Sequence, residues 1–368
     1  MSRIRWTLAV VGLTACGRIG FGAHTVDDAG ADGIVPGGDA ASDATSDAME
    51  LVVPATPIAG FDATGTTPAT TLAIARTGGA VAIGWLGPLP SAMWGVAVDA
   101  ANVPTTATPT QTSPTLGSTY GYRDLSLVYD GSHLLGMVSV PDDTLYLKTI
   151  APDMTMFFTA DSEVGHIAVP AFASAGAQWM GLYLTNGRPV AMPLNGDGRR
   201  VPPSTLLTDT SYVGATLAST GSRTLAVLAT ASGDCAVVSI NGALAPTFGS
   251  LGAPCAAPHL ASRGDQTALV AFEAAGGIAI SRLTPEPVTA TPPQVLATVG
   301  RAPRVAAATG YCVYWIDDGI RVAQPTATGF TLGRVTGVPA GPPDAYDVAG
   351  DVGFALWGTT LYRFPGCP

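Results

Sequence analysis

The 368-residue sequence is poor in charged residues, in aromatic residues and in lysine. Charged residues make up 12 % of it, about half of the ~25 % usual in soluble domains, and aromatic residues make up 7 %. Lys148 is the only lysine, and the net charge is −10. Such a chain lacks the basic face that a nucleic-acid-binding protein needs. Apolar residues nevertheless make up 47 %, which excludes a disordered chain, and the heptads of a coiled coil are missing.

Long hydrophobic runs are also missing, because none reaches the ~18 residues of a transmembrane helix. One short apolar run, Thr7–Ala15, directly follows Arg3 and Arg5 near the N-terminus. A positive segment followed by an apolar stretch of this length is typical of a signal peptide. We therefore expect residues 1–15 to direct export of the chain.

The four residues Leu13-Thr14-Ala15-Cys16 resemble the lipobox of bacterial lipoproteins, and the segment Cys16–Phe21 is similar to the start of many myxobacterial lipoproteins. This resemblance implies that Cys16 becomes the mature N-terminus and carries acyl chains (diacylglycerol and palmitate) that hold the protein on a membrane. Gly17, rather than Asp, follows the cysteine, which by the enteric rule favours the outer membrane. An ordinary signal peptide with a chance cysteine remains the alternative, and periplasmic or surface orientation stays open.

The segment from Val26 to Glu50 lacks basic residues. Between Val26 and Glu50 the sequence has seven carboxylates in a background of Ala, Gly and Ser. Such a composition cannot bury enough apolar area to offset the loss of chain entropy on folding. We expect residues 16–50 to be a flexible acidic tether.

From residue 51 to 368 the chain repeats one unit of three short apolar strands joined by glycine turns. Counting from turn glycine to turn glycine gives intervals of about 45 residues, the length of a four-stranded propeller blade. Segments rich in Thr, Pro and Val, such as Pro203–Asp209 and Pro293–Val299, supply the fourth strands. The turn glycines are Gly78, Gly131, Gly176, Gly221, Gly264, Gly310 and Gly350.

The last unit has only three strands, and Glu50–Phe61 can supply its missing strand. This closure would join the two ends of a ring and remove two exposed sheet edges. We therefore predict an all-β fold, a β-propeller of seven four-stranded blades whose last blade is closed by an N-terminal strand. A β-sandwich and a propeller of six or eight blades are the alternatives.

Within each unit the first strand alternates small and larger residues, as expected for the strand that lines the axis of a propeller. His259 occupies the small, axis-lining position in the fifth unit, and Asp347 is a possible polar neighbour in the seventh. The residues at the small position in other units are Ala73, Ser126, Ala171, Thr216 and Val305. We predict that His259, Ser126, Thr216 and Asp347 line the axial channel, where they could contact a ligand.

Four cysteines follow Cys16, and an even number in an exported chain favours disulfides. Of the three possible connectivities, Cys235–Cys255 with Cys312–Cys367 fits the repeat best, because Cys367 would then fix the C-terminus near the seam of the ring. Free buried thiols are the alternative. We expect no metal site at these cysteines, because none has C-x-x-C spacing and none neighbours a histidine.

The sequence contains no catalytic signature. Glu163, Glu273 and Glu286 lie in separate units, and a G-x-S-x-G elbow, a phosphate-binding loop and an H-E-x-x-H motif are absent. No cofactor is expected. The leading hypothesis is a monomeric envelope lipoprotein whose propeller binds a protein, peptide or glycan; the alternative is a hydrolase or lyase acting on polysaccharide. Two or more carboxylates with a His or Arg in the axial pocket would favour the enzyme.

Overall fold

The computed structural model describes residues 50–367, except for 68, 70, 88–91, 113–124, 130–133, 140–144, 155–156, 159–166, 176–177, 196–200, 222 and 327–328. The predicted signal peptide, lipidated Cys16 and nearly all of the tether lie outside the described residues. A compact unit runs from Ala48 to Pro368. Among the described residues, no helix is long and apolar enough to span a membrane.

All regular elements of the described chain are β-strands, and they form seven sheets, which confirms the predicted fold class. We number these blades in chain order. The innermost strands of blades 1 to 7 are β3 (Thr71–Arg76), β7 (Leu125–Tyr129), β11 (Ile167–Ala175), β15 (Gly214–Ser219), β19 (Ala256–Ser262), β24 (Arg301–Ala307) and β28 (Ala345–Ala349).

The strands further from the axis follow the same order. The second strands are β4 (Ala80–Leu86), β8 (Leu134–Ser139), β12 (Gln178–Thr185), β16 (Thr224–Ala229), β20 (Ala268–Ala274), β25 (Tyr311–Ile316) and β29 (Val352–Trp357). The third strands are β5 (Met93–Asp99), β9 (Leu145–Ile150), β13 (Arg188–Leu194), β17 (Asp234–Ile240), β21 (Gly277–Pro285), β26 (Ile320–Pro325) and β30 (Thr360–Pro365). The outer strands are β6 (Thr110–Gln111), β10 (Phe157–Phe158), β14 (Thr205–Leu206), β18 (Pro246–Pro254), β22 (Val288–Ala290) with β23 (Gln294–Ala297), and β27 (Phe330–Thr336).

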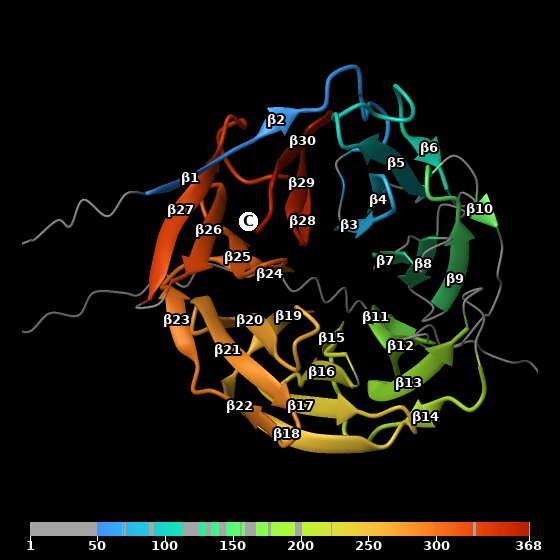
Figure 1. Ribbon diagram of the computed structural model, residues 1–368, viewed down its shortest axis with the longest axis vertical. Helices are drawn as coiled ribbons and strands as arrows, with labels where there is room; N and C mark the ends of the chain where they lie inside the picture. Colours follow the sequence, from blue (N-terminus) through green and yellow to red (C-terminus); the bar gives the residue numbers. More distant parts are fainter. Residues whose placement is uncertain are drawn as a thin grey trace, which may run out of the picture. The chain divides into compact units, whose positions relative to one another are not determined.

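The innermost strands contact one another in sequence around the axis, and β28 contacts β3, so the ring closes (Figure 1). Local sequence explains the sharp turns between strands. For example, Asn186 and Gly187 join β12 to β13 with φ values of +50° and +76°, the conformation of the two-residue turn that matches strand twist.

Two N-terminal strands cover the seam of the ring. The strand β2 (Thr56–Pro57) pairs with β30 of blade 7 and supplies the predicted closing strand. The strand β1 (Leu51–Pro54) pairs in parallel with β27 and adds an unpredicted fifth strand to blade 6. Gly333 permits this pairing, because a Cβ atom there would collide with the Leu51 carbonyl.

The apolar cores lie between neighbouring blades. At the seam, Ile83 and Trp85 of blade 1 share a buried cluster with Phe354 and Leu356 of blade 7. Phe61, which follows β2, packs its ring edge-on against Trp85 at a centroid distance of 6.1 Å. The closing segment therefore joins the same core as the blades that it connects.

Both predicted disulfides are present. Cys235 and Cys255 lie 5.9 Å apart and Cys312 and Cys367 lie 5.2 Å apart, measured between Cα atoms, within the usual range for a disulfide. Cys367 also donates its backbone N–H to the Gly350 carbonyl at 3.0 Å. The second disulfide thus ties the C-terminal segment, which belongs to blade 7, to the second strand of blade 6.

Candidate functional site

A cavity of about 420 Å³ is formed by the innermost strands of blades 1, 2, 4, 5, 6 and 7. Strand register identifies one equivalent residue on each of these strands, which we call the axial residue. The axial residues of these blades are Ala73, Ser126, Thr216, His259, Arg304 and Asp347. All six line the cavity, so the four predicted channel residues are placed together there. Their contact with a ligand remains a prediction.

In blade 6 the predicted axial residue was wrong. Val305 is 1 % exposed and belongs to the core between blades 5 and 6, whereas the side chain of Arg304 is 28 % exposed and lines the cavity. Counting back from Gly310 misplaced the position by one, because this turn has an extra residue before its glycine. The aliphatic residue that follows each axial residue, Val305 in this blade, would have been the better guide.

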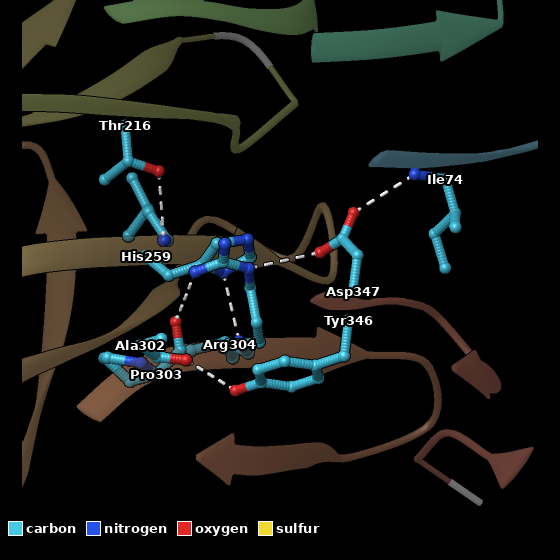
Figure 2. A network of polar contacts seen from close by, with 10 residues as sticks. Ile74, Thr216, His259, Ala302, Pro303, Arg304, Tyr346 and Asp347 are labelled. Atoms are coloured by element: carbon cyan, nitrogen blue, oxygen red, sulfur yellow. Dashed lines mark hydrogen bonds and ion pairs between the residues drawn. The ribbon is translucent and has the colours of Figure 1, made fainter. Parts of the chain in front are cut away.

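Three axial side chains accept hydrogen bonds from the backbone of the next blade (Figure 2). In each case the donor is the N–H of the residue that follows the neighbouring axial position. Thr216 Oγ1 accepts from Leu260 at 3.1 Å, His259 Nδ1 from Val305 at 3.0 Å, and Asp347 Oδ2 from Ile74 at 3.1 Å. These bonds connect blades 4 to 5, 5 to 6, and 7 to 1, so the axial residues hold neighbouring blades together.

Arg304 connects blades 6 and 7. Its Nε atom lies 3.4 Å from Asp347 Oδ1, and its Nη1 donates to the carbonyl of Pro303 at 3.0 Å. The guanidinium carbon lies 5.8 Å from the centre of the Tyr346 ring, within cation–π range. The charge of Arg304 is therefore held between a carboxylate and an aromatic face at the wall of the cavity.

The backbone beside Arg304 is fixed by side chains from two other blades. Ala302 has a φ of +50°, which a residue with a side chain rarely adopts. Glu273 of blade 5 accepts its N–H at 2.7 Å, and Tyr346 of blade 7 donates its hydroxyl to its carbonyl. The irregular start of β24, which aims Arg304 at the axis, is thus stabilised from both sides.

Burial changes the titration of two axial residues. Burial, together with the positive charge of the nearby Arg304, lowers the pKa of His259 to about 3. Burial also raises the pKa of Asp347 to about 6, although Arg304 opposes this change. At neutral pH His259 is therefore uncharged, and because its Nδ1 accepts a hydrogen bond, the ring proton lies on Nε2.

The described glutamates do not form a catalytic pair. Glu273 and Glu286 both belong to blade 5, contrary to their predicted separation into different units. Glu273 accepts the Ala302 N–H, as above, and Glu286 forms a 2.7 Å ion pair with Arg223. Glu163 lies outside the described residues. No group of three metal-ligating side chains occurs in the part of the chain that the structure describes.

A second, larger hollow of about 1120 Å³ lies at the outer edge of blades 5 and 6, beside β1. We call it the rim groove. Three of its aliphatic side chains are strongly exposed: Val52 (57 %), Val299 (55 %) and Leu332 (48 %). Its charged side chains pair with neighbours, Arg321 with Asp317 at 3.6 Å and Glu50 with Arg334 at 3.5 Å.

No protein family and no curated protein matches the chain. Solved structures of low identity do share its fold. U3-55K matches with a TM-score of 0.55 and 11 % identity over 84 % of this chain and 98 % of that chain, and the WD40 repeats of RRP9 match with a TM-score of 0.55 and 11 % identity, over 84 % and 97 %. Hydrazine synthase of Kuenenia stuttgartiensis matches with a TM-score of 0.51 and 12 % identity, over 80 % and 93 %.

Solved structures of different proteins share this architecture at low sequence identity. The similarity therefore supports the fold of this chain and does not indicate its function. The sheets, their order around the axis and these comparisons lead to one conclusion: the chain is a β-propeller, with seven blades in its described part.

Proposed function

We propose that this protein is an exported binding module, anchored to the bacterial envelope through acyl chains on Cys16, whose propeller binds a protein partner at the rim groove. The observation that carries the proposal is the exposure of Val52, Val299 and Leu332 around one hollow. Contiguous exposed aliphatic side chains of this kind mark protein–protein contact surfaces. In this proposal the protein is a monomer held on the outer membrane.

A protein fits the rim groove better than a glycan does. Trp315 and Phe330 also line the groove, but Trp315 is 4 % exposed and Phe330 is half-buried. The strongly exposed side chains, on which a sugar ring would have to stack, are therefore aliphatic. Arg321 and Glu50, which could bond to sugar hydroxyls, already pair with Asp317 and Arg334. An apolar segment of another protein would bury the three aliphatic side chains and leave the ion pairs at the edge.

Binding is also favoured over hydrolysis by the chemistry of the axial cavity. Among its described lining residues, Asp347 is the single carboxylate, whereas glycoside hydrolysis generally uses two. Both oxygens of Asp347 are engaged, one by Ile74 and one by Arg304. The acceptor atoms of Thr216 and His259 likewise bond to the next blade, so these groups support the ring.

The experiment compares Val299→Asp with Val213→Asp, a matched control that is 59 % exposed on blade 4. Each full-length chain is produced in cells, cross-linked in the envelope, and its partners are identified by mass spectrometry. We expect a partner that is captured by the wild type and the control but lost with Val299→Asp. Capture of the same partners at equal yield by all three chains would contradict the proposal.

The anchor is tested by Cys16→Ser. We expect this substitution to abolish incorporation of labelled fatty acid and to release the protein from the membrane fraction, because the proposed anchor needs the cysteine thiol. Equal labelling of the variant and the wild type would show that attachment does not use Cys16.

A further inference from the structure

The axial cavity combines hydrogen-bond donors with occupied acceptors. Thr216 Oγ1, His259 Nδ1 and Asp347 Oδ2 each accept a backbone N–H from the next blade. Thr216 retains its O–H and His259 its Nε2–H as donors. The backbone of the neighbouring blades thus satisfies the acceptors of the axial side chains and leaves their donors for a ligand.

Arg304 adds the cationic member of this set. Its guanidinium has five N–H groups, of which Nε faces Asp347 at 3.4 Å and Nη1 donates one bond to Pro303. The side chain is 28 % exposed. Among the described residues that line the cavity, it is the single cationic side chain, and Figure 2 shows its guanidinium pointing toward Asp347.

Small residues lie on the other part of the wall. Ala73 and Ser126 are the axial residues of blades 1 and 2, which lie across the ring from blades 5 and 6 (Figure 1). They leave a cavity of about 420 Å³, at the lower end of the ~300–1,000 Å³ typical of small-molecule sites. The site therefore has donors on one part of its wall and free space opposite them.

We propose that the axial cavity binds a small carboxylate, whose two oxygens accept hydrogen bonds from Arg304, His259 and Thr216. A planar guanidinium matches the two oxygens of a carboxylate. A monoanion fits better than a doubly charged phosphate, because Asp347 already balances much of the single positive charge. This site lies at the axis and is separate from the rim groove, so it stands independently of the proposed protein partner.

The neighbours of Arg304 predict how binding depends on pH. The groups that face it are Asp347 and Tyr346 from β28, His259 from β19 and Glu273 through Ala302. Burial raises the pKa of Asp347 to about 6, so below that pH the carboxyl becomes neutral and no longer competes for the guanidinium. His259 stays neutral down to a pH of about 3. A carboxylate should therefore bind more tightly at pH 5 than at pH 8.

The test uses acetate as the probe and the thermal unfolding midpoint of the full-length protein as the readout. Ionic strength is held constant with chloride, and phosphate is titrated in parallel. We expect the midpoint to rise saturably with acetate, and at pH 8, where phosphate is mostly a dianion, to rise less with phosphate. The half-saturating concentration of the acetate anion should be lower at pH 5 than at pH 8. Isothermal titration calorimetry supplies the dissociation constant.

Two variants assign the effect to the cavity. Arg304→Gln should weaken acetate binding at least tenfold, the size expected for loss of a charged hydrogen bond. Arg321→Gln is the matched control, since its side chain is 29 % exposed on the same blade and is also paired with aspartate, and it should bind acetate like the wild type. Ser126→Leu narrows the cavity without touching the charged pair, so it keeps the test valid if Arg304→Gln fails to fold.

Three outcomes would overturn the proposal. They are the absence of saturable stabilisation by acetate, an equal response in Ser126→Leu and the wild type, and stronger stabilisation by phosphate than by acetate at pH 8. Each of these outcomes leaves the capture experiment at the rim groove unaffected.

Discussion

At the scale of single residues, the axial position carries most of the chemistry. The innermost strands converge where space is short, and those of blades 1, 2, 4, 5, 6 and 7 each place one axial side chain at the cavity. An acceptor atom of a polar side chain there needs a hydrogen-bond donor, because its contact with water is reduced. A backbone N–H of the next blade supplies that donor. Thr216, His259 and Asp347 all use it. Burial keeps His259 neutral, and the hydrogen bond that its Nδ1 accepts from Val305 places the ring proton on Nε2.

The pH dependence of stability follows from the opposite pKa shifts of two axial residues. Asp347 has a folded pKa of about 6 against an ordinary 3.8, so between these pH values the folded protein binds a proton that the unfolded chain does not, and acid stabilises the fold. His259 has a folded pKa of about 3 against 6.5, so there the unfolded chain binds the extra proton and acid destabilises the fold. The two effects largely cancel between about pH 4 and 6.

Asp347→Asn should remove this cancellation. Relative to the wild type, the variant should lose up to about 3 kcal/mol of unfolding free energy as the pH falls from 7 to 4. Urea unfolding at several pH values measures the difference. Val213→Ala changes no titratable group at an exposed position, so it is the control and should differ from the wild type by a constant amount. A constant difference for Asp347→Asn as well would show that Asp347 has an ordinary pKa.

At the scale of elements, the strand β1 is the feature that sequence reasoning missed. The turn glycines and apolar runs predicted the strands of the repeat and the closing strand, because each has a local signal. The segment Leu51–Pro54 has four residues and pairs in parallel with a strand nearly 300 residues away. The strand conformation of this segment depends on its pairing with β27, where Gly333 leaves room for the Leu51 carbonyl.

Gly333→Ala should therefore displace β1. A Cβ atom at this position meets the Leu51 backbone, whereas at Gly329 on the same blade it meets nothing within 4 Å. We expect Gly333→Ala to cost about 1–3 kcal/mol of unfolding free energy and to speed hydrogen exchange in β1, and Gly329→Ala to change neither. Unchanged exchange in β1 of the Gly333 variant would contradict the observed pairing.

The candidate site was partly predictable, because some of its residues also have a local signal in the sequence. Period-two alternation placed Thr216 and His259 at the axis, because alternation survives in every unit. Arg304 was missed because turn length varies from blade to blade and shifts the count from the glycine. The hydrogen bonds between blades were not predictable, because they join residues that are 44 or more positions apart in the sequence.

At the scale of the whole molecule, the ring is closed by backbone pairing and by a covalent bond at the seam. The strand β2 pairs with β30, and Cys312–Cys367 ties the C-terminal segment to blade 6. Replacing both of these cysteines with alanine opens a loop of 55 residues and should cost about 4 kcal/mol, whereas opening the 20-residue loop of Cys235–Cys255 should cost about 3 kcal/mol. Chemical unfolding of the two double variants compares these losses, and an unchanged stability in both would contradict the predicted contribution of the disulfides.

A rigid closed ring with an apolar groove at its rim is the basis of the proposed function, and site-specific photo-cross-linking tests it most directly. A photoreactive amino acid is placed at Val299 or, as control, at Val213, and the cells are irradiated. We expect one dominant cross-linked protein from position 299 and none from position 213. Equal cross-linking from both positions, or none from either, would contradict binding at the rim groove.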